Sequence, residues 1–263
     1  LFLSKQYKEA LATYRKAEKM EDLPPKNYPN LMYLTGCSEF FTGDYAGAVA
    51  DFKKMLVLDE TKWQKVANYM VTSLQKCGEH DEALAWTERM IGGNINKDFA
   101  LRRRADIFCE VGRYEDCTNA IWELESNFPL DEAICLLKAQ LGFAKGDFEE
   151  VTRQLDMEFA RPKRKNTYDY ECYIMRAQIA LQTGNYKDAL DFVDKAVREP
   201  MPPYSTKLRG DIYYAMGEKL KALDFYKEFL KISPSVTRNE YVTGLVAKIQ
   251  DEVLEEAGRM ENQ

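Results

Sequence analysis

The stretch Gly43–Phe52, GDYAGAVADF, returns five more times along the chain in altered form. Each copy starts with glycine, and most have an aromatic residue two positions later and a small residue three positions after that. The other copies begin at Gly78, Gly112, Gly146, Gly184 and Gly217. A related stretch, KQYKEALATY, begins at Lys5 with lysine in place of the glycine.

The spacing and the surroundings of these glycines predict paired helices. Successive glycines lie 35, 34, 34, 38 and 33 residues apart. Apolar residues recur every three or four positions on both sides of the glycine, as in residues 28–41 and 44–58, and this period places them on one face of a helix. Glycine ends a helix well because it adopts the left-handed conformation without strain. We therefore expect an all-α chain of about fourteen helices and no strand.

In these features the chain resembles the tetratricopeptide repeat family, whose period is about 34 residues. The resemblance covers residues 1–234 and includes the glycine pairs 36/43 and 210/217 and the prolines at 129 and 234. The small residue is alanine in five copies, namely Ala10, Ala48, Ala83, Ala189 and Ala222. The chain departs from the pattern where His80 and Lys219 replace the aromatic residue and where Cys117 and Val151 replace the alanine. The resemblance implies a right-handed superhelical solenoid of helix hairpins.

The same pattern predicts how the chain is organised. Residues 1–237 form the repeat array, with about six full repeats after a partial one, and residues 238–263 form a C-terminal capping helix with an acidic tail. We expect Tyr241, Leu245, Ile249 and Val253 to cover the last repeat. The partial first repeat indicates a piece of a longer protein. The basic stretch 161–165 is either a solvated loop between repeats or a targeting or acidic-partner site.

Composition and motifs argue against several classes of function. The net charge is -6 with basic residues scattered along the chain, which disfavours nucleic acid as a partner. No apolar run approaches the ~20 residues of a membrane-inserted helix. The six cysteines contain no CxxC pair and there is one histidine, His80, so we expect no metal, no cofactor and a cytoplasmic location. No phosphate-binding loop or nucleophile–base pair occurs, which indicates a non-enzyme.

The resemblance implies that function lies on the concave face built by the first helix of each repeat. On that face we expect an aromatic and aliphatic groove, interrupted by polar residues, that binds extended or helical partner segments. Phe40, Phe143, Leu181 and Tyr214 stand at equivalent positions; the alternative is that neighbouring helices simply pack them. The candidate partner-binding residues are Tyr33, Phe40, Asn68, Phe99, Arg102, Phe143, Ile174, Tyr204, Lys207 and Tyr214.

Three functions fit this groove. The first is a protein–protein interaction scaffold that binds proteins or peptides as a component of a multi-subunit assembly. The second is a co-chaperone or targeting receptor that captures peptide ends, for which Asn68, Arg102 and Arg103 match only part of the family's carboxylate clamp. The third is the regulatory arm of a larger enzyme.

Overall fold

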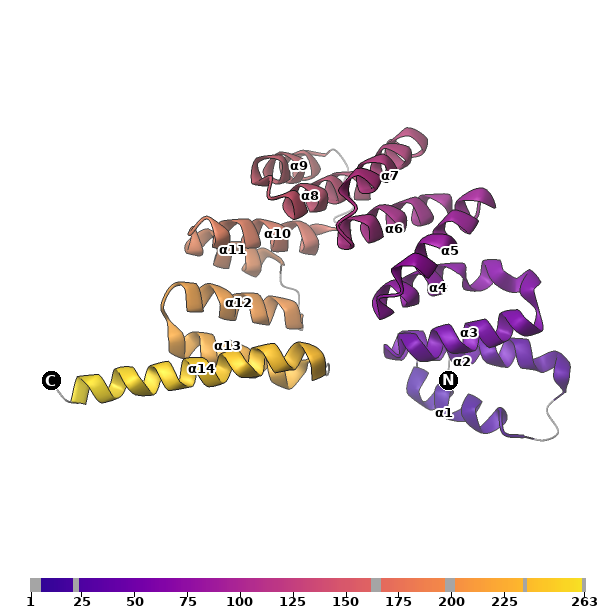
Figure 1. Cartoon of the computed structure of the whole chain (residues 1–263), viewed down its shortest axis with the longest axis horizontal. Helices are drawn as coiled ribbons and strands as arrows, with labels where there is room; N and C mark the ends of the chain where they lie inside the picture. The colour runs from indigo at the N-terminus through magenta and orange to yellow at the C-terminus, as the bar shows by residue number, and fades with distance from the viewer. Residues whose placement is uncertain (1–5, 21–23, 162–166, 197–201, 234–235, 262–263) are drawn as a thin grey trace. The chain divides into compact units, whose positions relative to one another are not determined.

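A computed structural model describes residues 6–20, 24–161, 167–196, 202–233 and 236–261 (Figure 1). These segments are almost entirely α-helical, and they contain no strand. The all-α class and the expected number of helices are confirmed. The chain divides into two compact units, Leu1–Asp147 and Phe148–Gln263, which are described separately.

The first unit contains eight of the described α-helices and two short 3-10 helices, Pro25–Asn27 and Glu60–Lys62. Its α-helices are α1 (Tyr7–Ala17), α2 (Tyr28–Thr42), α3 (Tyr45–Leu58), α4 (Trp63–Cys77), α5 (His80–Gly92), α6 (Lys97–Glu110), α7 (Tyr114–Asn127) and α8 (Ala133–Lys145). The second unit contains α9 (Phe148–Ala160), α10 (Asp169–Gln182), α11 (Tyr186–Ala196), α12 (Pro203–Ala215), α13 (Lys219–Ile232) and α14 (Val236–Glu261).

A glycine ends the first helix of each hairpin in the same way. At the first turn Gly43 has a φ of +87°, and its amide donates a hydrogen bond to the Phe40 carbonyl at 3.1 Å. All six turn glycines have φ between +76° and +87°, a region in which a side chain is strained. The repeated glycine therefore sets the hairpin geometry, as the sequence predicts.

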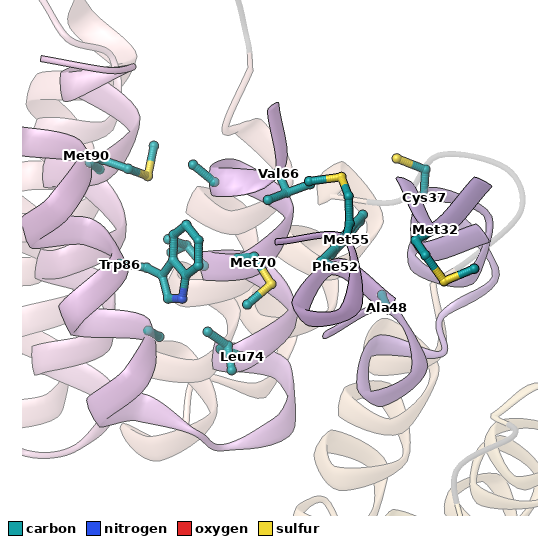
Figure 2. Packing of buried hydrophobic residues seen from close by; sticks show 14 of the residues in the cluster. Met32, Cys37, Ala48, Phe52, Met55, Val66, Met70, Leu74, Trp86 and Met90 are labelled. Carbon is teal, nitrogen blue, oxygen red and sulfur yellow. The ribbon is translucent and has the colours of Figure 1, made fainter. Parts of the chain in front are cut away.

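The small residue of the repeat is a buried position. Ala48, Ala83, Ala189 and Ala222 are buried, as are the larger replacements Cys117 and Val151. Packing is equally close at Gly36 and Gly210, where an added Cβ would lie 2.7 Å from the Phe52 ring and the Tyr226 ring respectively. Figure 2 shows how residues of successive helices, from Met32 of α2 to Met90 of α5, join into one apolar core.

The last helix, α14, packs against α13 (Figure 1). Its buried residues are Val242, Val246 and Ile249, with Leu245 and Val253 partly buried beside them. The prediction for Tyr241 is wrong, because this side chain is 69% exposed and Val242 is buried in its place. The division into an array up to residue 237 and a cap from 238 stays a prediction, since α14 runs unbroken from Val236.

The basic stretch 161–165 falls largely outside the described residues. Only Arg161 is described, and its Nη1 lies 3.6 Å from Oε2 of Glu158. The partial first repeat also begins in residues that the structure does not describe.

A buried charge cluster joins α1, α2 and α3 in the first unit. The carboxylates of Glu39 and Asp51 are both buried, and the Arg15 guanidinium bonds to each of them, reaching Asp51 at 2.8 Å. Lys54 also contacts Asp51 at 2.8 Å. Burial and the nearby Asp51 raise the pKa of Glu39 to about 7, although Arg15 opposes the shift. Glu39 therefore titrates near neutral pH in the folded protein.

This shift predicts how stability depends on pH. The pKa of Glu39 is about 7 in the folded state and about 4.5 in the unfolded state. Between these two pH values the folded state therefore binds one proton more than the unfolded state. The contribution of Glu39 protonation to the free energy of unfolding is therefore greatest at low pH, and it is lost as pH rises through about 7. The difference in unfolding free energy between wild type and Glu39→Gln should change by at most about 1.4 kcal/mol per pH unit across this window.

The test is urea unfolding of both proteins near pH 5 and near pH 8, followed by tryptophan fluorescence. Trp63, Trp86 and Trp122 are the three tryptophans of the chain, and all lie in the first unit. A difference between the two proteins that stays constant with pH would show that Glu39 does not titrate as described.

Candidate partner-binding surfaces

Within each unit, the leading helices of neighbouring hairpins adjoin one another. In the first unit α2 contacts α4, α4 contacts α6 and α6 contacts α8, and in the second unit α10 contacts α12. Neighbouring trailing helices, such as α3 and α5, make at most slight contact within the described residues. The leading helices therefore lie closer together than the trailing ones within each unit, and their outward side chains form a continuous surface.

One position on this surface is held identically in every hairpin. The residue three before the turn glycine is half-buried each time, and its carbonyl accepts a hydrogen bond of 3.0–3.2 Å from the glycine amide. We call these six residues the turn-proximal track: Phe40, Gln75, Cys109, Phe143, Leu181 and Tyr214. Four residues that the sequence places at equivalent positions thus also share the same backbone hydrogen bond, namely Phe40, Phe143, Leu181 and Tyr214.

Tyr33 and Phe40 come together in an aromatic cluster at the start of the first unit. The Phe40 ring meets Tyr69 of α4 edge to face with centroids 5.0 Å apart, and Tyr33 lies 6.5 Å from Phe52. Burial raises the pKa of Tyr33, and the contact with Cys37 adds a smaller rise. The Tyr33 hydroxyl therefore stays neutral. Both predicted residues are half-buried, which leaves part of each ring open to a partner.

The polar candidates of the first unit already have partners inside the chain. Asn68 accepts a hydrogen bond of 3.1 Å from Asn96, and Arg102 pairs with Asp98 at 2.5 Å and with Asp131 at 3.7 Å. Phe99 is half-buried and lies beneath the Arg103 guanidinium at 5.4 Å. These contacts hold the side chains in place, and a partner would have to share them.

In the second unit the candidates gather on α12. Tyr204 is 46% exposed, and its hydroxyl accepts a hydrogen bond of 2.6 Å from Gln178 of α10. Lys207 pairs with Asp211 at 2.7 Å, and the Tyr214 hydroxyl donates a 3.5 Å hydrogen bond to Glu252 of α14. Ile174 differs from them because it is 6% exposed and belongs to the core. It offers a partner little surface.

Some exposed features lie outside the predicted set. Phe41 is 45% exposed and stacks on Tyr7 with centroids 4.5 Å apart, and Trp122 is exposed on the trailing helix α7. A pocket of about 530 Å³ lies among α5, α6 and α7, with both acidic and basic side chains in its lining, including Glu88, Arg104 and Arg113. Repeat spacing gives no signal for any of these, because they stand outside the recurring positions.

Within the part of the chain that the structure describes, no three acidic, histidine or cysteine side chains form a set that could hold a metal ion. His80 is the first residue of α5 and is half-buried, the place that Tyr45 takes in α3 and Tyr114 in α7. None of the described helices is long and apolar enough to span a membrane.

Comparison with known families agrees with this architecture. The model of the family described as tetratricopeptide repeat-like domain matches residues 115–248, half of the 263-residue chain. The chain belongs to the tetratricopeptide repeat-like family. A crystal structure of a tetratricopeptide repeat protein from Parabacteroides merdae matches with a TM-score of 0.75 and 20% identity, over 94% of both chains. This likeness concerns the fold.

Two sequence relatives of this tetratricopeptide repeat chain carry names with a biological role. Human Protein O-mannosyl-transferase TMTC1 is 23% identical over 164 residues, which are 60% of this chain and 18% of the relative. Photosystem I assembly protein Ycf3 of Acaryochloris marina is 29% identical over 103 residues, 38% of this chain and 60% of the relative. The chain therefore matches less than two thirds of the length of either relative.

Proposed function

We propose that the chain is a non-enzymatic scaffold that binds extended or helical segments of partner proteins on its leading-helix surface, as part of a multi-subunit assembly. The observation that carries this proposal is the turn-proximal track. Its side chains share one backbone setting in all six hairpins and stay half-buried. Within each unit, recurring partly open and mainly apolar side chains suit a partner segment that offers apolar anchors along its length.

The charged residues beside the track have a supporting role in this proposal. Arg102 and Lys207 each pair with an internal carboxylate, at 2.5 and 2.7 Å, so neither is a free cation. Such pairs add orientation and specificity more than affinity when a partner approaches. The same pairing argues against the capture of peptide C-termini, because a carboxylate end would have to displace Asp98 or Asp211. Location in the cytoplasm stays a prediction.

The regulatory arm of a larger enzyme is the second candidate. It is favoured by the match to the O-mannosyl-transferase relative, in which the similar region is 18% of the whole protein. The coding sequence on both sides of this segment tests it: a transferase domain there would support this reading. The assembly role has its own parallel in the relative named as an assembly protein.

We expect Tyr204→Ala and Phe143→Ala to weaken binding of a genuine partner. A buried aromatic anchor commonly contributes about 2 kcal/mol, so each change should lower affinity roughly thirtyfold. The measurement is affinity purification with quantitative mass spectrometry, after circular dichroism has verified that each variant is folded. Tyr204 is the cleaner site, because it is 46% exposed in the free protein.

The matched control is Trp122→Ala, which removes an exposed aromatic ring from the trailing helix α7. It should leave partner recovery unchanged. If the leading-helix variants keep every partner and Trp122→Ala loses them, the trailing-helix side is the docking surface and the proposal is wrong.

A further inference from the structure

In the second unit an arginine of a leading helix pairs with a carboxylate of the trailing helix before it. Arg176 of α10 bonds to Asp156 of α9, and Arg209 of α12 bonds to Asp194 of α11. Each arginine stands eight residues before the turn glycine of its own hairpin, and each aspartate stands ten residues after the preceding turn glycine. Two successive hairpins of this unit are therefore joined by the same ion pair in the same register.

The same register in the first unit contains Arg104 and Glu88, but there the pair is not formed. Arg104 of α6 stands eight residues before Gly112, and Glu88 of α5 stands ten residues after Gly78. The Arg104 guanidinium bonds instead to Glu123 of α7, the trailing helix of its own hairpin. Glu88 consequently makes no ion pair or side-chain hydrogen bond to any residue that the structure describes.

A pocket of about 530 Å³ lies at this junction, among α5, α6 and α7, and Glu88 is part of its lining. Ala120 of α7 also lines the pocket and stands eight residues after its turn glycine. At that distance α11 carries Phe192 and α13 carries Phe225, and each ring lies beside the arginine of its own hairpin, at 5.7 and 5.8 Å. The smaller alanine and the missing ion pair therefore leave room that side chains take up in the second unit.

The lining of this pocket carries an excess of negative charge. Its two guanidinium groups, of Arg104 and Arg113, are each bonded to a carboxylate of the same lining. The other carboxylates of the lining belong to Asp81 and Glu88. Across the described ranges of the chain neither of them has a cationic partner, and both are exposed. Two carboxylates without a counter-charge favour a ligand that brings positive charge.

The spacing of these two carboxylates limits the ligand further. Asp81 and Glu88 are seven residues apart, so they lie on one face of α5 about 10 Å apart along its axis. Leu84 and Ala85 stand between them and line the same pocket. In an extended segment, residues three apart span about 10 Å. Two long cationic side chains at that spacing can place their charged ends on the carboxylates and their stems on the apolar surface between.

We propose that this pocket is a second binding site, which takes two arginine side chains, three residues apart, of an extended partner segment. One guanidinium bonds to Glu88 as Arg176 bonds to Asp156 in the second unit, and the other bonds to Asp81. Arginine suits both carboxylates because its planar guanidinium can donate two parallel hydrogen bonds to one carboxylate. The site lies between the trailing helices α5 and α7, so it does not rest on the function proposed for the leading-helix surface.

The test titrates the synthetic peptide GRGGRG, with both ends blocked, into the ¹⁵N-labelled chain at low ionic strength, where exposed charges are least screened. We expect the amide signals of α5 and α7 to shift, and the titration gives the dissociation constant. Citrulline keeps the shape of arginine without its charge. A peptide with citrulline at both positions should therefore bind at least about tenfold more weakly.

The variants Glu88→Gln and Asp81→Asn should each weaken binding of GRGGRG about fivefold, because each removes one of the two ion pairs. Both should fold, since both side chains are exposed. The matched control is Glu115→Gln, which removes an exposed carboxylate of α7 that lies outside the pocket lining. It should bind the peptide as wild type does.

Three results would overturn the proposal: no shifts in α5 and α7, equal binding of the citrulline peptide, or unchanged affinity in both Glu88→Gln and Asp81→Asn. Spermidine, a small polyamine, supplies a further comparison. If it binds as tightly as GRGGRG, the pocket takes a small cation and not an arginine segment, and the proposal is wrong. None of these results bears on the leading-helix surface, because the test uses a defined peptide and variants of α5 and α7 alone.

Discussion

Replacing Ile249 with alanine should lower the free energy of unfolding of the second unit by about 3 kcal/mol. Ile249 is completely buried where α14 packs on α13. Truncation removes apolar contacts and leaves a cavity that the surrounding helices fill only in part. Leu254→Ala is the matched control, because this residue of the same helix is 70% exposed. It should change the free energy by less than about 0.5 kcal/mol.

The measurement is urea unfolding followed by far-ultraviolet circular dichroism, which reports on the helices of both units. Tryptophan fluorescence is recorded in parallel, since all three tryptophans lie in the first unit. An Ile249→Ala protein as stable as Leu254→Ala would contradict the packing described for α14.

Removal of residues 238–263 should disrupt the same packing between α13 and α14 more severely. Without most of α14, the buried side chains of Leu223, Tyr226 and Phe229 lose their cover. An exposed apolar helix face promotes association, and the end of a repeat array needs a covered face for solubility. We expect aggregation or a lower thermal midpoint. Unchanged solubility and thermal unfolding would show that the helix does not act as a cap.

The features that follow from local backbone geometry could be predicted from the sequence. The conformation of Gly43 depends on hydrogen bonds to residues three and four positions earlier, so the sequence around it is sufficient. The burial of Ala48 follows equally, because two helices joined at such a turn must meet at that position. The same reasoning placed Phe40 and Phe143 in equivalent settings.

The sequence did not predict which face of α14 is buried, or which side chains far apart in the sequence contact one another. Tyr241, Leu245, Ile249 and Val253 are spaced by four residues, and each step of four turns a helix about 40° beyond a full circle. Over three steps the drift reaches about 120°, so the first residue points away from the face of the last. The structure buries Val242 instead. The contact between Asn68 and Asn96 was also missed, because repeat spacing does not show which side chains meet.

The second large effect is expected for Arg15→Met in the first unit. The change keeps much of the side-chain volume but removes the cation that bridges the buried carboxylates of Glu39 and Asp51. An uncompensated buried charge commonly costs about 3–5 kcal/mol. Because Arg15 is itself 37% exposed and Lys54 still contacts Asp51, we expect a loss at or just below the lower end of this range, about 2–3 kcal/mol near pH 8.

The loss should depend on pH and on Glu39. Near pH 5 the Glu39 carboxyl is protonated in the folded state, so one of the two charges that Arg15 balances is gone and the variant should lose less. Adding Glu39→Gln to Arg15→Met should likewise restore part of the stability near pH 8, because it removes that charge permanently. Urea unfolding followed by tryptophan fluorescence measures all three proteins in the unit that contains the cluster.

Arg113→Met is the matched control for the removal of a guanidinium. Arg113 pairs with Asp116 at 2.7 Å, but the two side chains are 52% and 43% exposed, and exposed pairs contribute about 1 kcal/mol or less. Arg15→Met could lower the free energy of unfolding no more than Arg113→Met does, or lower it equally near pH 5 and near pH 8. Either result would show that Arg15 does not stabilise the buried carboxylates. In that case α1 would be held to α2 and α3 by apolar contacts alone, with Tyr14 and Ala17 packed against the core as its anchors.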